Sequence, residues 1–160
     1  MHASPFLKVP HVERIASNKS AFAIWDRFPA SPGHALVVPH RLISPWWEAS
    51  EEERSDLFGL VEVVREIVSE RHDPDGYNIG INIGKAGGQT IDHLHVHVIP
   101  RYSGDMPDPR GGVRHVIPSK GNYLIDSDPG RSPVLLDGLD DGQLLLELFR
   151  CLDNPIFDRI

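Results

Sequence analysis

The stretch His93–Arg101 has the sequence HLHVHVIPR and places three histidines at alternate positions. Alternate side chains of a β-strand point to the same face of a sheet, so the three histidines are predicted to line one face of a strand over Thr90–Ile99. The apolar residues between and after them are predicted to pack into a core: Leu94, Val96 and Val98. Three buried imidazoles are costly without partners, which indicates a functional site.

Three further segments are predicted to form strands of the same sheet. Ala21–Arg27 and His34–His40 are β-prone and flank a short loop rich in proline and glycine, which is typical of an antiparallel pair. Tyr77–Ile83 is a third apolar run, and a glycine-rich connection joins it to the histidine strand. The sequence therefore predicts a mostly antiparallel sheet of about five strands.

One long helix is predicted between the second and third of these strands. Ser50 and Glu53 have the spacing of a capping box at its start, and the turn at 73–76 (DPDG) marks its end. Apolar residues recur at helical spacing between them: Leu57, Leu60, Val61, Val64 and Val68. The fold class expected is α+β, with this helix packed on the sheet.

The last part of the chain differs in composition. Residues 126–160 contain eight acidic and three basic residues, and Asp140–Pro155 is predicted to form a shorter amphipathic helix. We expect a catalytic domain over residues 1–125, followed by an acidic tail over 126–160. This tail either packs on the domain or begins a further module.

Composition and charge restrict the possible partners. The net charge of −7 argues against affinity for nucleic acid polymers, and no apolar run approaches the roughly 20 residues of a membrane helix. The single cysteine excludes a disulfide framework within the chain. The N-terminal segment lacks the layout of a signal peptide, so a cytoplasmic location is expected.

The residues alone leave two chemical interpretations of the histidines open. Histidine binds zinc, with His34, Asp92 or His115 as a further ligand. Alternatively, a neutral imidazole attacks phosphorus or carbon while its neighbours stabilise charge and move protons. The glycine-rich segment Gly84–Thr90 favours the second interpretation, because its backbone N–H groups can surround an anion and Gln89 and Thr90 add side-chain donors.

The segment GGQTIDHLHVHVIPR resembles the motif of the histidine triad (HIT) superfamily, and AFAIWDRFPASPGHALVVPHR resembles its opening hairpin. The similarity covers roughly residues 20 to 101. The Pro-Arg pair after the triad resembles the Fhit-type dinucleoside polyphosphate hydrolases more than the Hint-type phosphoramidases.

The resemblance implies roles for eight residues. His95 is the expected nucleophile, His93 and His97 hold the phosphate and assist proton transfer, and His34 is a fourth imidazole beside them. Asp26 matches the position that binds the ribose hydroxyls, and a carboxylate suits two hydroxyl donors. The phosphate-binding positions correspond to Asn82, Gln89 and Thr90, although Asn82 is shorter than the glutamine of the Fhit type.

The function implied is cleavage at the α-phosphate of a dinucleoside polyphosphate such as diadenosine tetraphosphate. A nucleotidyl-histidine forms at His95, and a nucleoside monophosphate is released. The resemblance implies a homodimer, no bound metal and no required cofactor, with Mg²⁺ at most a counter-ion of the substrate. Alternatives are a Hint-like nucleoside phosphoramidase, a zinc hydrolase and a non-catalytic nucleotide-binding module.

Overall fold

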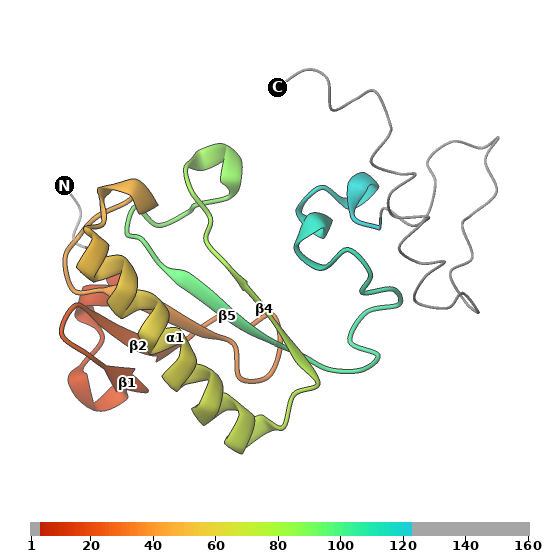
Figure 1. Cartoon of the computed structure of the whole chain (residues 1–160), viewed down its shortest axis with the longest axis horizontal. Coiled ribbons are helices and arrows are strands. Elements are labelled where there is room, and N and C mark those ends of the chain that lie inside the picture. Colours follow the sequence, from red (N-terminus) through yellow and green to blue (C-terminus); the bar gives the residue numbers. More distant parts are fainter. Residues whose placement is uncertain (1–3, 123–160) are drawn as a thin grey trace. The chain divides into compact units, whose positions relative to one another are not determined.

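The computed structural model describes residues 4–122, which contain one five-stranded sheet with the order β1-β2-β3-β5-β4. All neighbouring strands are antiparallel. Together with the long helix α1, this sheet confirms the predicted α+β class (Figure 1). The strands are Ala16–Ser17 (β1), Ala21–Trp25 (β2), Ala35–Pro39 (β3), Gly76–Gly80 (β4) and Val96–Arg101 (β5).

All four predicted strands are shorter than predicted, and the boundaries of two of them differ most. β4 ends at Gly80 instead of Ile83, and β5 begins at Val96 instead of Thr90. Before Val96 the backbone does not form hydrogen bonds with β3 or β4. Instead, Leu94 N–H donates to Ile43 O, which precedes α1, at 2.6 Å. Only His97 of the three histidines therefore lies within the regular strand, although all three keep the alternating direction of their side chains relative to the core.

The helix α1 spans Glu51–His72 and has the predicted cap. Ser50 Oγ accepts from the backbone N–H of Glu53, and the Glu53 carboxylate accepts from the backbone N–H of Ser50. Arg41 also donates to Glu53, and these hydrogen bonds lower the pKa of Glu53 to about 2. The helix ends where Asp73 adopts a left-handed conformation, with φ of 47°.

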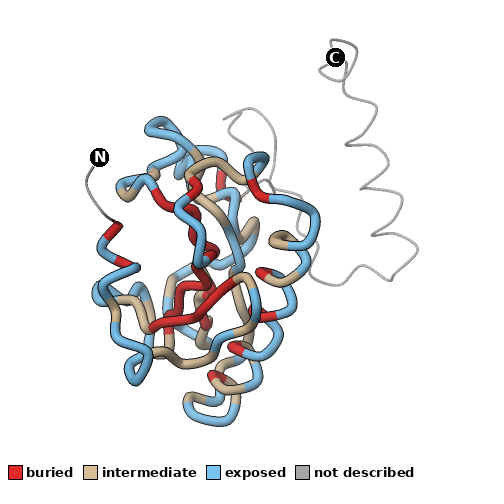
Figure 2. Tube along the Cα trace, turned by 90° about the vertical axis from the view of Figure 1, so that its left-hand side faces the viewer, coloured by how far each residue is buried: buried red, intermediate tan, exposed pale blue. Residues whose placement is uncertain are grey.

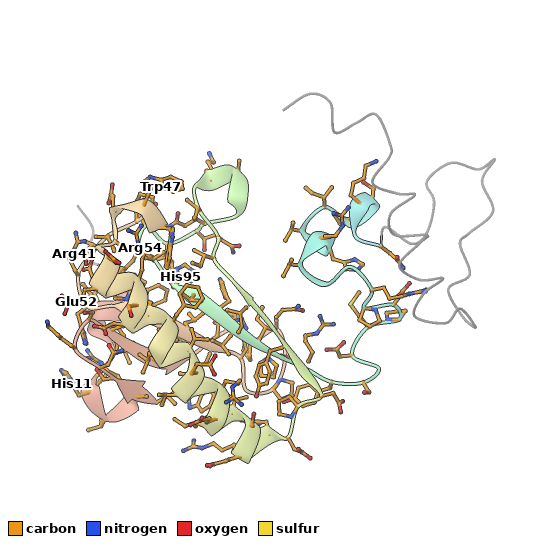
Figure 3. The ribbon with its side chains drawn as sticks, viewed as in Figure 1. His11, Arg41, Trp47, Glu52, Arg54 and His95 are labelled. Atoms are coloured by element: carbon orange, nitrogen blue, oxygen red, sulfur yellow. The ribbon has the colours of Figure 1, made fainter. Side chains whose placement is uncertain are left out.

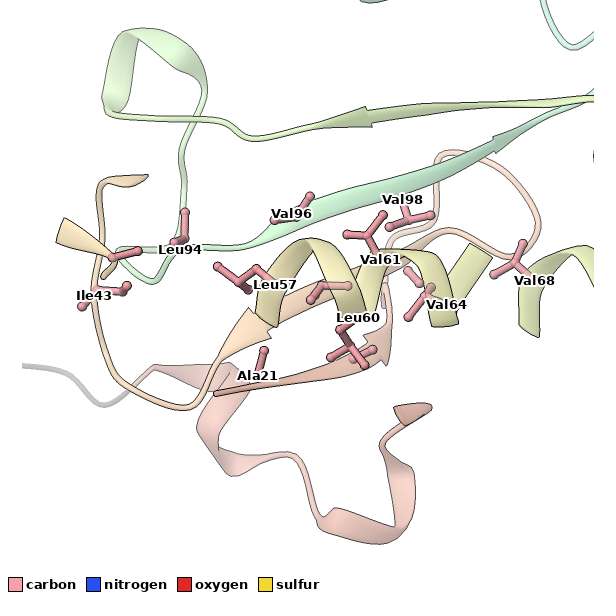
Figure 4. Packing of buried hydrophobic residues seen from close by; sticks show 14 residues of the cluster. Ala21, Ile43, Leu57, Leu60, Val61, Val64, Val68, Leu94, Val96 and Val98 are labelled. Atoms are coloured by element: carbon pink, nitrogen blue, oxygen red, sulfur yellow. The ribbon is translucent and has the colours of Figure 1, made fainter. Parts of the chain in front are cut away.

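The helix covers one face of the sheet, and its predicted apolar positions are buried there (Figure 4). They pack against small and β-branched residues of β2, β3 and β5, which include Ala21, Val37, Val96 and Val98. Leu94 is also buried in this cluster, as predicted. Figure 2 shows that the buried residues, in red, are concentrated in the strands, while helical turns carry single buried positions.

A second apolar cluster occupies the opposite face of the sheet. It contains Phe22 and Ile24 of β2, Leu36 and Val38 of β3, and Phe6, with Val9 and Ile91 packed beside them. Phe6 belongs to the short 3₁₀-helix η1 (Pro5–Lys8), which is followed by η2 (His11–Glu13). The other short helices are η3 (Trp46–Glu48), η4 (Lys85–Gly87), η5 (Gly112–Val116) and η6 (Pro118–Lys120).

The chain divides into two compact units, Met1–Asp108 and Pro109–Ile160. The predicted helix over Asp140–Pro155 and the acidic tail over 126–160 lie outside the described residues, so the predicted domain boundary after residue 125 stays a prediction. Within residues 4–122, no helix combines the length and the apolar character that crossing a bilayer requires.

Candidate active site

A cavity of about 930 Å³ lies over the second apolar cluster. The register aligns Ile24 of β2 with Leu36 of β3 and Leu36 with His97 of β5, and all three side chains line the cavity. His95, Asp26, Thr90 and Ile91 complete the wall near this row. Four of the eight predicted site residues therefore border one cavity: Asp26, Thr90, His95 and His97.

His95 presents one defined ring nitrogen to this cavity. Its Nδ1 lies 2.8 Å from the backbone carbonyl oxygen of His93, which can only accept, so Nδ1 carries the proton. In the neutral ring, Nε2 then holds the lone pair. The edge of the Phe6 ring contacts the His95 ring at a centroid distance of 5.2 Å and restricts its orientation. Figure 3 labels His95 near the start of β5.

His93 is fully buried and does not line the cavity. Its Nε2–H donates to the carbonyls of Pro39 at 3.0 Å and Arg41 at 3.1 Å, and its Nδ1 accepts from Ser4 Oγ at 2.8 Å. The expectation that His93 holds the phosphate does not fit this geometry, because both ring nitrogens already have protein partners. His93 acts through its backbone carbonyl, which orients His95.

His97 and His34 are linked by a hydrogen bond of 3.1 Å between His97 Nδ1 and His34 Nε2. The backbone N–H of Ala30 donates to His34 Nδ1 at 3.1 Å, so the proton of His34 is on Nε2. His34 Nε2–H therefore donates to His97 Nδ1, and the proton of His97 is on Nε2. This buried nitrogen has no hydrogen-bond partner in the described part of the chain. It is an unpaired donor on a residue that lines the cavity.

Burial keeps these imidazoles neutral. It lowers the pKa of His97 to about 4, with further lowering from the nearby His95 and His34. Burial also lowers the pKa values of His34 and His93. Asp26 Oδ2 lies 3.5 Å from His34 Nδ1, but this contact is not an ion pair, because that nitrogen is unprotonated and accepts from Ala30.

The loop between β2 and β3 positions Asp26 and His34. Asp26 N–H donates to the backbone carbonyl of His34 at 3.0 Å, and Ser31 Oγ fastens the loop to Pro100 O at 2.6 Å. Gly33 has φ of +82°, and a Cβ there would lie 2.8 Å from the His72 ring, so this turn requires glycine. Asp26 Oδ1 accepts from Phe28 N–H, and Oδ2 can accept from a ligand.

The glycine-rich loop is closed by Gln89. Its Oε1 accepts from Gly84 N–H at 2.8 Å, and its Nε2 donates to Ser44 Oγ and Ile91 O, both at 3.1 Å. The Gln89 amide thus fixes the loop, and neither Gln89 nor Asn82 lines the cavity. Their predicted contacts with phosphate stay predictions. Thr90 is exposed and does line it.

Of the three further metal ligands suggested by the sequence, only His34 forms a possible ligand group with a triad histidine among the described residues. Ligand atoms of Asp26, His34 and His97 lie within 4.8 Å of one another and are the group best placed to hold a metal. However, the lone pairs of His34 Nδ1 and His97 Nδ1 already accept hydrogen bonds. Asp92 is exposed, and His115 belongs to the unit Pro109–Ile160, where its Nε2 donates to Arg110 O.

Sequence reasoning missed the N-terminal contribution to the site. Ser4 and Phe6 contact the triad, and Arg14 lines the cavity. Ser4 caps the short 3₁₀-helix η1, Phe6 belongs to it, and Arg14 follows η2; such short helices have no hydrophobic periodicity to reveal them. The apolar residues Phe6 and Val9 in a polar segment were the available signal. Arg101, which ends the segment HLHVHVIPR, donates to Asp105 and Asn78 and does not line the cavity.

Comparisons with known proteins identify relatives of this chain. The AP-4-A phosphorylase of Mycobacterium tuberculosis is 34% identical over 109 residues, which cover 64% of this chain and 56% of that protein. The asymmetrical bis(5'-nucleosyl)-tetraphosphatase of Schizosaccharomyces pombe is 38% identical over 80 residues, which cover 50% and 44%. The chain thus spans about half the length of the curated relatives it matches.

Among solved structures, the NitFhit protein of Caenorhabditis elegans matches with a TM-score of 0.59 and 30% identity. The match covers 62% of this chain and 24% of that one. The family model described as HIT domain matches residues 10–104, which include the sheet, α1 and all eight residues predicted for the site. The chain belongs to the HIT domain family, and its relatives confirm the resemblance to the Fhit-type branch.

Proposed function

We propose that this protein cleaves dinucleoside polyphosphates at the α-phosphorus through a covalent intermediate on His95. The observation that carries the proposal is the hydrogen bond from His95 Nδ1 to the carbonyl of His93, which leaves the Nε2 lone pair free in a cavity. Attack forms the bond from Nε2 to phosphorus and breaks the bond from phosphorus to the bridging oxygen. The remaining polyphosphate leaves as an anion. The ring becomes positively charged, and the His93 carbonyl stabilises that charge.

A second step releases the nucleotide. Water attacks the phosphorus, the bond to Nε2 breaks, and a nucleoside monophosphate leaves with a proton passing to solvent. The free Nε2–H of His97 is the donor proposed to stabilise negative charge on the bridging oxygen. Asp26 Oδ2 is proposed to accept from the ribose hydroxyls, and Thr90, which lines the cavity, to bind phosphate oxygens.

The neutral state of His97 favours a polyphosphate over an amine as the leaving group. A polyphosphate leaves as a stable anion and needs only hydrogen bonding, whereas the amine of a phosphoramidate must receive a proton. Because burial lowers the pKa of His97 to about 4, this ring rarely carries a second proton at neutral pH. This favours the hydrolase over the Hint-like phosphoramidase, and the names of the relatives agree with it.

Side-by-side turnover of diadenosine tetraphosphate and an adenosine phosphoramidate tests the proposal. The protein is stripped with a chelator, supplied with Mg²⁺ alone, and compared with His95→Ala. We expect AMP from diadenosine tetraphosphate, slower release from the phosphoramidate, and no turnover by the variant. ADP formed when phosphate is added identifies phosphate as the second acceptor, which the name of the M. tuberculosis relative suggests.

Three outcomes contradict the proposal. Activity that returns only with Zn²⁺ supports a metal hydrolase, for which Asp26, His34 and His97 are the nearest ligand group. Unimpaired turnover by His95→Ala shows that His95 is not the nucleophile, and nucleotide binding without any turnover supports a binding module.

The homodimer stays a prediction from the resemblance, and the cytoplasmic location stays a prediction from the N-terminal sequence. Light scattering after size exclusion tests the homodimer.

A further inference from the structure

We infer that Arg14 recognises the base of the bound nucleotide and selects guanine over adenine. The inference rests on the proposed function, since it assumes that the cavity beside His95 holds a nucleotide. It adds a substrate preference that the family resemblance does not imply.

Arg14 lines the candidate site and has no ion-pair partner among the described residues. It lines the same cavity as His95 and His97, and its Nε is buried without a hydrogen-bond partner among the described residues. Its guanidinium makes one long hydrogen bond there, from Nη2 to Val9 O at 3.4 Å.

Arg14 and His97 mark two ends of the site. Within the described residues, Arg14 Nε and His97 Nε2 are the two buried side-chain polar atoms that lack a partner. Buried donors rarely remain unpaired, and both of these belong to residues that line one cavity, which fits a ligand with acceptors near each side chain. His97 suits the phosphate, which leaves Arg14 for the far end of the nucleoside.

The register of β2 supports this layout. Asp26, Ile24 and Phe22 follow one another at steps of two residues. Asp26 and Ile24 line the cavity, whereas Phe22 is buried beneath it in the second apolar cluster, with the Arg14 guanidinium 4.1 Å from the centroid of its ring. Phe22 is two residues from Ile24, which is two strands from His97, so the backbone positions are separated by roughly 12 Å. That separation suits the length of a nucleoside monophosphate.

The sequence of side chains along β2 then matches the parts of a nucleoside. Asp26 can contact the ribose. The flat face of the base can lie on the apolar surface of Ile24, Leu36 and Val9, and Arg14 can then contact the edge of the base. A guanidinium only donates hydrogen bonds. Guanine presents two adjacent acceptors, O6 and N7, which suit a bidentate arginine, whereas adenine presents a donor amine at the corresponding position.

Glu13 can also contribute to a preference for guanine over adenine. Glu13 lines the cavity, as Arg14 does. A carboxylate accepts from the N1–H and N2–H groups that guanine has and adenine lacks. A phosphate bound at Arg14 is the competing interpretation. It predicts that both nucleotides lose affinity equally when the guanidinium is removed, and this difference defines the test.

Calorimetric binding of GMP and AMP to the full chain tests the inference. We expect GMP to bind more tightly, on the order of tenfold. Arg14→Met should remove the preference by weakening GMP alone. Arg65→Met, which alters a half-buried arginine of α1 outside the cavity, should retain the preference. Arg14→Lys keeps the charge without the bidentate fork, so it should lose most of the preference even where Arg14→Met fails to fold.

An absence of base preference in the unmodified protein overturns the inference, as does an equal loss of GMP and AMP affinity in Arg14→Met. Turnover distinguishes this failure from failure of the proposed function. If diguanosine and diadenosine tetraphosphates are cleaved equally well, the base preference alone is wrong. If neither dinucleotide is cleaved and neither mononucleotide binds, the proposed function is wrong as well.

Discussion

The Nδ1 of His95 and the backbone carbonyl oxygen of His93 are 2.8 Å apart, and this hydrogen bond determines which nitrogen of His95 faces the cavity. The carbonyl is itself held in place, because both ring nitrogens of His93 bond to the protein. The first triad histidine thus positions the second, and the third is positioned separately by His34. The three histidines have different partners and different consequences when changed.

Ser4 is predicted to support catalysis without touching substrate. Its hydroxyl accepts from Phe6 N–H at 3.2 Å and donates to His93 Nδ1, so Ser4→Ala leaves a buried nitrogen unpaired. We expect a loss of about 1–3 kcal/mol in the free energy of unfolding, together with a lower kcat. Chemical denaturation and steady-state kinetics measure both. Ser55→Ala, at an exposed helical position, is the control and should change neither appreciably; a similar loss in both variants would contradict the role of Ser4.

Gly33 is predicted to be required by the loop that carries His34. Gly33→Ala would be strained at a φ of +82°, and its new Cβ would lie only 2.8 Å from the His72 ring. We expect destabilisation of about 1–2 kcal/mol, with reduced turnover because His34 shifts. Gly59 lies in α1 with open space around it, so Gly59→Ala should instead stabilise by about 0.5–1 kcal/mol. Thermal unfolding of the pair checks the prediction, and equal effects would refute it.

Stability is predicted to fall in mild acid because of His97. Its pKa is about 4 in the folded protein and about 6.5 when unfolded, so the unfolded state binds more protons between these values. The contribution is present above pH 6.5 and is lost as the pH falls toward 4. Urea unfolding across this range should show a smaller decline in His97→Asn. An unchanged decline, or an NMR titration of His97 near 6.5, would contradict the burial of a neutral ring.

Much of the fold was predictable because its signals are local. The capping box of Ser50 and Glu53, the apolar spacing of α1 and the alternation around His95 each depend on a few neighbouring residues, and the structure confirms them. The start of β5 could not be predicted, because the backbone hydrogen bond from Leu94 to Ile43 joins segments far apart in the sequence. Periodicity is silent about such contacts.

The site was predictable in composition but not in geometry. Alternation placed the histidines on one face, yet only their partners show that His93 is buried and that His95 and His97 are protonated on different nitrogens. Ser4 is 89 positions from His93, and no sequence pattern connects them. The resemblance supplied the residue roles, whereas the tautomers required the three-dimensional structure.

Trapping the intermediate tests the central claim most directly. Turnover of a dinucleoside polyphosphate is quenched in alkali, which preserves phosphohistidine-type bonds, and the protein is digested and sequenced by tandem mass spectrometry. The account predicts a nucleotidyl group on His95, absent from His95→Ala and lost on further incubation with water before the quench. A nucleotidyl group on another residue, or active turnover without any covalent adduct, would contradict it.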